Sequence, residues 1–190
     1  MTDVARLIDQ AVLNSSVENR TWIVRALGEH ESSLVRYAKL FVGDVDTARD
    51  IVQDTFLKLC RHTAESAEAQ DRLQQTNLKA WLFRVCRNRA IDICRKENRM
   101  KLLKPNELDT AVEDAQRPTD QIQLQEQTEI LNDRISELPQ KQQEVLRLKF
   151  QSGLTYREIA EVMDVSATNV GFLLHTAIGK LRLQMGAEGS

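Results

Sequence analysis

Basic side chains gather beside a tryptophan in residues 81–104. Residues 84–104 contain eight bases and only two acids, Asp92 and Glu97. At about 100° per residue, one face of a helix here carries Arg84, Arg87, Asn88, Arg95 and Arg99, with Trp81 at its border. Cations that neutralise phosphates, beside a ring on which a base can stack, are typical of proteins that bind partly unstacked nucleic acid. The alternative is a solvated helix face.

A second set of polar residues follows the pattern of a helix-turn-helix. Thr155 and Glu158 have the spacing of a capping box, which opens a short helix. Asp164 tolerates the left-handed conformation that a tight turn needs, and Ser166 can cap the next helix. The second helix of such a motif enters the major groove of DNA. The alternative is a plain helical hairpin that binds nothing.

The side chains of this motif suit contacts with duplex DNA. Thr168 and His175 can hydrogen-bond base edges, and Phe172 can contact a thymine methyl group. Arg157, Lys180 and Arg182 are placed for phosphates. Each of these bases can equally be a surface charge, and Phe172 can instead contact another part of the protein.

The sequence shows no motif for catalysis or metal binding. The sequence has no phosphate-binding loop and no nucleophile paired with a base, so we expect no enzymatic activity and no cofactor. The three cysteines, Cys60, Cys86 and Cys94, form no CxxC pair. We expect three reduced thiols in a cytoplasmic protein, with no metal site.

The elements that position these residues are predicted to be helices. Glycine (7) and proline (3) are scarce among the 190 residues, which favours an all-α fold. Apolar periodicity predicts helices at 3–13, 17–27, 29–42, about 45–62, 78 to beyond 99, 124–138, 140–151, 155–163 and from 167 onward. Ala48, Ile51, Val52, Phe56 and Leu59 form the apolar repeat of the fourth helix. We expect a loop or frayed helix at 63–76.

An acidic segment separates the two basic regions. Residues 105–126 contain six acids and one base, with Pro105 and Pro118 as breaks. We therefore predict two small helical domains joined by an acidic linker: a 1–20 extension, a 21–104 domain, a 105–123 linker and a 124–186 domain. The net charge of −2 excludes a uniformly basic coat. No apolar run approaches a membrane span, and no secretory signal is visible.

Together these motifs resemble the bacterial sigma-70 superfamily, in its small two-domain extracytoplasmic-function (ECF) group. Residues 50–57, Asp-Ile-Val-Gln-Asp-Thr-Phe-Leu, resemble region 2.2 of that family. Residues 81–92 look like regions 2.3 and 2.4, and residues 138–145 and 156–160 look like region 4. The resemblance covers nearly everything from Trp22 to Leu183.

The resemblance implies a subunit that directs RNA polymerase to promoters. Asp50, Gln53, Asp54 and Phe56 would contact the β′ clamp helices. Trp81, Arg84, Arg87, Asn88, Arg95 and Arg99 would bind the melted minus-ten element. Arg157, Ser166, Thr168, Phe172, His175 and Lys180 would bind the minus-thirty-five element, and the same domain would bind the β-flap. An anti-sigma factor is left open as a further partner, and we expect a monomer when free.

Two departures from the family pattern affect these expectations. The family commonly has Asp-Ala-Glu-Asp where this chain has Thr47-Ala48-Arg49-Asp50. This difference predicts that binding to core RNA polymerase is weaker or uses different contacts. A phosphate on Thr47 would restore the charge. The family also has Lys-Ser-Arg where this chain has Gly171-Phe172-Leu173, so family rules for the minus-thirty-five sequence do not carry over. Two other readings stay open: a stand-alone helix-turn-helix regulator, and an adaptor or decoy that binds no DNA.

Overall fold

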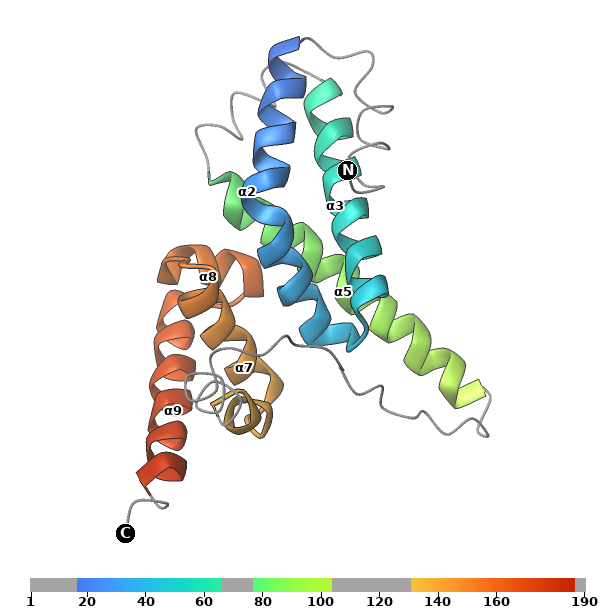
Figure 1. The fold of residues 1–190 in the computed structure, drawn as a ribbon. Helices are drawn as coiled ribbons and strands as arrows, with labels where there is room; N and C mark the ends of the chain where they lie inside the picture. Colours follow the sequence, from blue (N-terminus) through green and yellow to red (C-terminus); the bar gives the residue numbers. More distant parts are fainter. Residues whose placement is uncertain (1–16, 66–76, 104–130, 187–190) are drawn as a thin grey trace, which may run out of the picture. The chain divides into compact units, whose positions relative to one another are not determined.

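The computed structural model describes residues 17–65, 77–103 and 131–186, and every regular element in these ranges is a helix (Figure 1). The predicted helix at 3–13, the acidic linker and most of the 63–76 segment lie outside the described residues. Contacts divide the chain into two compact units. The first contains α2 (Val17–Val42), α3 (Val45–Glu65) and α5 (Leu78–Leu103). The second contains α7 (Gln140–Leu146), η1 (Arg147–Gln151), most of α8 (Tyr156–Met163) and α9 (Ala167–Gly186).

The first unit is a bundle in which each of the three helices packs on the other two. Its core side chains recur at three- and four-residue spacing, which places them on one stripe of each helix. The largest of them are Ile23, Leu34, Tyr37, Ile51, Phe56, Leu59, Leu82 and Phe83. The Tyr37 ring packs edge-on against Phe41 and Phe83, with centroids 5.4 and 5.1 Å apart. The contact between Tyr37 and Phe83 joins α2 to α5.

Helix α2 is longer than the sequence pattern predicted. The two predicted stretches, 17–27 and 29–42, form one continuous helix through Gly28. A glycine inside a helix costs about 1 kcal/mol relative to alanine, and buried Ile23, Leu27 and Leu34 on the same helix offset that cost. The predicted boundary at residue 20 falls inside α2, and the domain limits stay a prediction.

The ends of the bundle helices have local causes. Gly43 has a φ of +74° and its N–H donates to the Lys39 carbonyl at 2.9 Å, so it ends α2 as predicted. Asp44 caps α3 by accepting a hydrogen bond from the Thr47 N–H at 2.7 Å. Asn77 caps α5 by accepting one from the Ala80 N–H at 3.2 Å. The first turns of α3 and α5 are thereby fixed.

The second unit packs α7 against α9 and contains the predicted helix-turn-helix. Its buried side chains include Val145, Leu148, Leu154, Ile159, Val170 and Leu174. Thr155 and Glu158 form both hydrogen bonds of a capping box. Asp164 is left-handed, with a φ of 55°, and Ser166 Oγ accepts a hydrogen bond from the Asn169 N–H at 3.2 Å. The motif predicted from residue types is therefore present.

The helix predicted at 140–151 differs in its details. Pro139 is the N-cap, and the α-helix gives way to a π-helical turn after Leu146. The Ser152 N–H donates to the Arg147 carbonyl at 3.0 Å, five residues back. This wider turn keeps Leu148 buried while Phe150 stays 67% exposed. None of the described helices combines the length and apolar character needed to cross a membrane.

Candidate nucleic-acid interface

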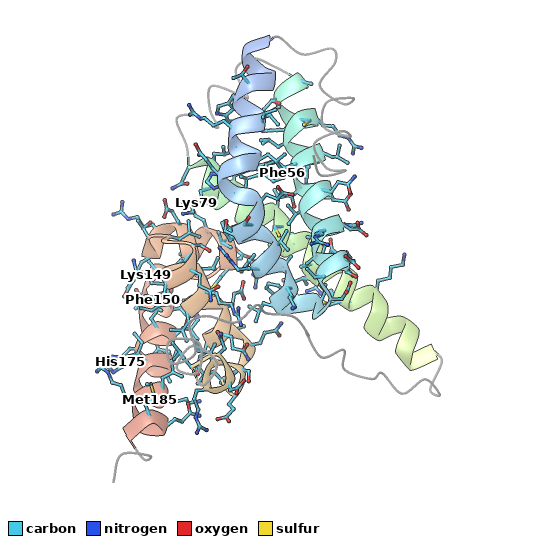
Figure 2. The ribbon with its side chains drawn as sticks, viewed as in Figure 1. Phe56, Lys79, Lys149, Phe150, His175 and Met185 are labelled. Atoms are coloured by element: carbon cyan, nitrogen blue, oxygen red, sulfur yellow. The ribbon has the colours of Figure 1, made fainter. Side chains whose placement is uncertain are left out.

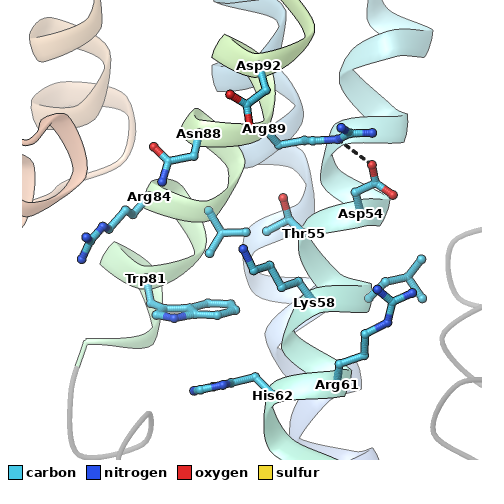
Figure 3. A pocket seen from close by; sticks show the side chains of 12 residues that line it. Asp54, Thr55, Lys58, Arg61, His62, Trp81, Arg84, Asn88, Arg89 and Asp92 are labelled. Atoms are coloured by element: carbon cyan, nitrogen blue, oxygen red, sulfur yellow. Dashed lines mark hydrogen bonds and ion pairs between the residues drawn. The ribbon is translucent and has the colours of Figure 1, made fainter.

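An open groove of about 750 Å³ runs between α3 and α5 in the first unit (Figure 3). Its polar lining contains more cations than carboxylates, because four bases face two acids. The lining residues are Asp54, Thr55, Leu57, Lys58, Arg61, His62, Trp81, Arg84, Val85, Asn88, Arg89 and Asp92. The groove is therefore built by two helices, whereas the predicted basic face lies on α5 alone.

Trp81 forms the aromatic part of this groove together with a residue from α3. The ring of His62 lies stacked on the indole, with centroids 5.8 Å apart and an angle of 17° between the planes. Both side chains are half-buried. Sequence reasoning found Trp81 but missed His62, although Lys58, Arg61 and His62 recur at the spacing of one helix face.

The structure brings some of the predicted basic residues together and not others. Arg84 and Asn88 are exposed and line the groove beside Trp81. Arg95 is exposed on α5 but is not among the groove residues, and Arg87 is half-buried. Arg99 belongs to α5, and its side chain lies outside the described residues. Leu82, Cys86 and Ala90 of α5 lie in the bundle core, whereas Val85 is half-buried and lines the groove.

An ion pair joins the two helices that line the groove (Figure 3). Arg89 Nε lies 2.8 Å from Asp54 Oδ2 and joins α5 to α3. Both side chains are nearly half exposed, so water screens the pair. Asp54, predicted for a protein partner, therefore also lines the groove between α3 and α5. Arg89 is not among the site residues predicted from the sequence.

The predicted partner-binding edge on α3 needs one correction. Asp50 and Asp54 are exposed and Gln53 is half-buried, so these three polar side chains do reach the surface. Phe56 is fully buried, with 0% exposure, so its assignment to the partner contact was wrong. Six residues after Asp50, it lies about 240° further around the helix, on the stripe that packs in the bundle core (Figure 2).

The helix-turn-helix presents its predicted polar residues to solvent. Arg157 is exposed on α8, and Thr168, Phe172, His175 and Lys180 are exposed on α9. Phe172 is 67% exposed, so no other described part of the protein covers it. Ser166 is exposed, but its oxygen already caps α9. The Ser166 hydroxyl can still donate its proton in a hydrogen bond to a phosphate.

A cation and an aromatic ring beside this motif were missed. Lys149 Nζ lies 5.4 Å from the centre of the Tyr156 ring, a cation–π contact. A Cβ built on Gly171 would lie 3.7 Å from that ring, so Tyr156 packs against the start of α9. Phe150, next to Lys149, is 67% exposed (Figure 2). No spacing rule could find this cluster, because it joins η1, α8 and α9.

The cysteines form no disulfide among the described residues. Burial raises the pKa of the Cys60 thiol to about 11 and that of Cys86 to about 12. Thiols with such pKa values are almost entirely protonated at neutral pH, which makes them poor nucleophiles and poor metal ligands. No cluster of three or more metal-ligating side chains is found in the described ranges.

Comparison with known proteins assigns both units. Residues 27–100 match the family model of Sigma-70 region 2, and residues 128–181 match that of Sigma-70 region 4. The chain is 27% identical over 152 residues to the ECF RNA polymerase sigma factor SigM of Bacillus subtilis, which covers 80% of this chain and 87% of that protein. It is 27% identical over 168 residues to the ECF RNA polymerase sigma factor SigL of Mycobacterium tuberculosis, over 88% of this chain and 91% of that one.

Solved structures show the same fold. The sigma factor RpoE of Bartonella quintana, in complex with the anti-sigma factor NepR, gives a TM-score of 0.67 at 22% identity, over 85% of this chain and 95% of that chain. CnrH, in complex with the cytosolic domain of CnrY, gives 0.56 at 21% identity, over 98% and 99%. A stand-alone helix-turn-helix regulator has no need of region 2, so the two family matches decide against that alternative. The chain belongs to the sigma-70 family, as an RNA polymerase sigma factor of the extracytoplasmic-function group.

Proposed function

We propose that the groove between α3 and α5 holds the unstacked non-template strand of the minus-ten element. The observation that carries this proposal is the placement of the Trp81 ring beside exposed Arg84 and Asn88 in one open groove. Cations neutralise the phosphates, and the indole replaces stacking that a melted base has lost. Exposed Arg95 extends the cationic surface along α5, and Arg99, predicted for the same strand, belongs to this helix.

The polar edge of α3 supplies the contact with core RNA polymerase. Asp50, Gln53 and Asp54 lie within two turns, and a carboxylate edge suits a basic partner surface such as the β′ clamp helices. Beside this edge, Arg49 Nη1 pairs with Asp46 Oδ1 at 3.2 Å. Arg49 stands where the family commonly has a glutamate. Because Asp46 partly neutralises the Arg49 charge, the edge keeps its acidic character.

The second unit reads duplex DNA and binds the β-flap. Its exposed side chains on α9 face the minus-thirty-five element: Thr168 and His175 by hydrogen bonds, Phe172 by apolar contact. Arg157 and Lys180 bind phosphates. The chain itself catalyses nothing. It acts in the cytoplasm and is a monomer when free. An anti-sigma factor is among its expected partners. The polymerase performs the chemistry.

Transcription from fragmented genomic DNA tests this function. Core polymerase is compared with and without the protein, and the 5′ ends of new RNAs are mapped. We expect new starts that share upstream sequence at two fixed distances. Arg84→Ala should lower the yield of these starts, whereas Arg36→Ala, which removes an exposed cation of α2 outside the groove, should not. The absence of new starts despite core binding would contradict the proposal.

A further inference from the structure

The two faces of the Trp81 indole have different surroundings. One face is stacked by His62. In Figure 3 the indole lies between His62 on one side and Lys58, Arg84 and Asn88 on the other. All of these residues line the same groove. Because His62 lies along one face of the indole, an unstacked base would stack on the other face, which is directed toward the polar groups.

Both rings are carried by helix ends that are held in place. His62 lies in the last turn of α3, where buried Thr63 donates a hydrogen bond to the Leu59 carbonyl at 3.0 Å. Trp81 lies in the first turn of α5, where its N–H donates to the Asn77 carbonyl at 3.1 Å. Ala80 and Leu82 on either side of it are buried. The backbone positions of the pair are therefore set by the bundle.

The side-chain orientation of Trp81 is not set by the core in the same way. The indole is half-buried, and among the described residues its one ring contact is His62. An unsupported indole at a groove wall can rotate among several side-chain conformers, and each lost conformer costs free energy when a base binds. Because the His62 ring restricts the indole to fewer conformers before a base binds, it removes this free-energy cost in advance.

We propose that His62 is a positioning residue for promoter melting: it stacks on one face of Trp81 and holds the other face ready for a single unstacked base. The inference rests on the proposed function of the groove. It makes His62 part of the DNA-reading apparatus without direct contact to the base. The property of His62 that matters is then its aromatic ring.

Holoenzyme assembled from core polymerase and the full chain tests the inference on a fork-junction promoter. Single abasic nucleotides replace each non-template base of the melted segment in turn, and affinity is measured for wild type, Trp81→Leu, His62→Leu and His62→Phe. Phenylalanine keeps the ring, whereas leucine keeps apolar bulk without a π-face. Far-UV circular dichroism and urea unfolding check that the variants stay folded, and His62→Gln serves as a second ring-free variant.

We expect one position at which the abasic nucleotide weakens wild-type binding by about fivefold or more, the low end of measured base–aromatic stacking. Trp81→Leu should lose this penalty, His62→Leu and His62→Gln should reduce it, and His62→Phe should restore it. A full penalty in His62→Leu, or an equal defect in His62→Phe, would overturn the inference. So would a defect of His62→Leu that is the same at every position, because that result indicates a purely structural role.

Failure of the proposed function gives a different result. If wild-type holoenzyme initiates at the promoter but shows no position-specific abasic penalty, base stacking on Trp81 and the role of His62 are overturned, whereas promoter-specific initiation by this sigma factor stands. If wild-type protein binds core but supports no promoter-specific initiation, both proposals are overturned.

Discussion

Two phenylalanines show how a single side-chain type takes opposite roles in this sigma factor. Phe56 has 0% exposure in the bundle of α2, α3 and α5, whereas Phe172 is 67% exposed on α9. The first contributes stability by removing apolar surface from water. The second gains nothing from the fold and is available to a partner. Substitution of each residue should separate the two roles.

Phe56→Ala should lower the free energy of unfolding of the first unit by about 3–5 kcal/mol, because it leaves a cavity in a packed core. Phe172→Ala should change it by no more than about 0.5 kcal/mol, as is usual for surface substitutions. Urea unfolding of both variants checks the difference. Phe172→Ala should instead weaken binding of the holoenzyme to the minus-thirty-five duplex. Equal stability of the two variants would contradict the burial assigned to Phe56.

At the scale of single residues, the sequence predicted burial better than it predicted partners. The apolar repeat from Ala48 to Leu59 already placed Phe56 on a core stripe. Its assignment to the polymerase contact came from the family resemblance, which transfers a motif without saying which face of the helix each residue occupies. His62 was missed for the converse reason, since its role depends on Trp81, 19 positions further along the chain.

The start of α3 has a pH-dependent cap. The pKa of the Asp44 carboxyl is lowered, chiefly because it accepts a hydrogen bond from the backbone N–H of Thr47. A group whose pKa falls on folding stabilises the native state above its unfolded pKa, and this contribution is lost as pH falls through the folded pKa. The stabilisation should therefore be complete at neutral pH and decline below the ordinary value of 3.8.

Asp44→Asn isolates this cap, because the amide oxygen can still accept the Thr47 hydrogen bond but does not titrate in this range. Between pH 5 and pH 3 the variant should lose less stability than the wild type, measured by urea unfolding at each pH. Asp44→Ala removes the cap at every pH and provides the reference. Identical pH dependence in wild type and Asp44→Asn would show that the carboxylate does not act as the cap.

Contact between α3 and α5 includes one ion pair that the separate helix patterns could not predict. Asp54 and Arg89 are 35 positions apart, and they meet only because the bundle core aligns their helices. An exposed pair of this kind contributes about 0.2–1 kcal/mol. A double-mutant cycle with Asp54→Asn and Arg89→Gln should give a coupling in that range, and the coupling should fall as salt concentration rises.

Asp50 provides a matched control for this cycle. It is an exposed carboxylate one turn earlier on α3, and no ion pair joins it to Arg89 among the described residues. The cycle of Asp50→Asn with Arg89→Gln should give a coupling near zero. A similar coupling in both cycles would indicate a general charge effect in place of a specific pair.

At the scale of elements, helix existence followed from the sequence and helix pairing did not. Capping residues and periodicity located α3, α5, α8 and α9 because both signals are local in the chain. The groove depends on which faces of α3 and α5 are adjacent, and this is decided by the side chains buried in the bundle, among them Tyr37 on α2, Phe56 on α3 and Phe83 on α5. The periodicity of an α-helix also could not predict the π-helical turn at η1, because this turn shifts the hydrogen-bond register by one residue.

For the whole molecule, two DNA-reading units on one chain predict weak binding by the free protein. Each unit offers a small cationic surface, and each needs the polymerase to set its distance from the other. Free protein should therefore bind a promoter fragment far more weakly than holoenzyme does, in the same buffer. Equal affinity of the free protein and the holoenzyme would indicate that the chain positions its own units on DNA.

The change in the salt dependence of holoenzyme binding, when a groove cation is removed, measures whether that cation of the first unit neutralises a phosphate. Each phosphate contact with a single strand contributes about 0.7 to the slope of log affinity against log salt concentration. Arg84→Ala, which removes a groove cation, should therefore lower affinity and flatten the slope by about 0.7, and Arg95→Ala should do the same if its exposed side chain reaches the strand. Arg36→Ala carries the same change in net charge but lies on α2, outside the groove, and should leave the slope unchanged. A slope that changes equally in all three variants would mean that net charge controls binding, whereas a change confined to Arg84 would restrict the strand to the groove beside Trp81.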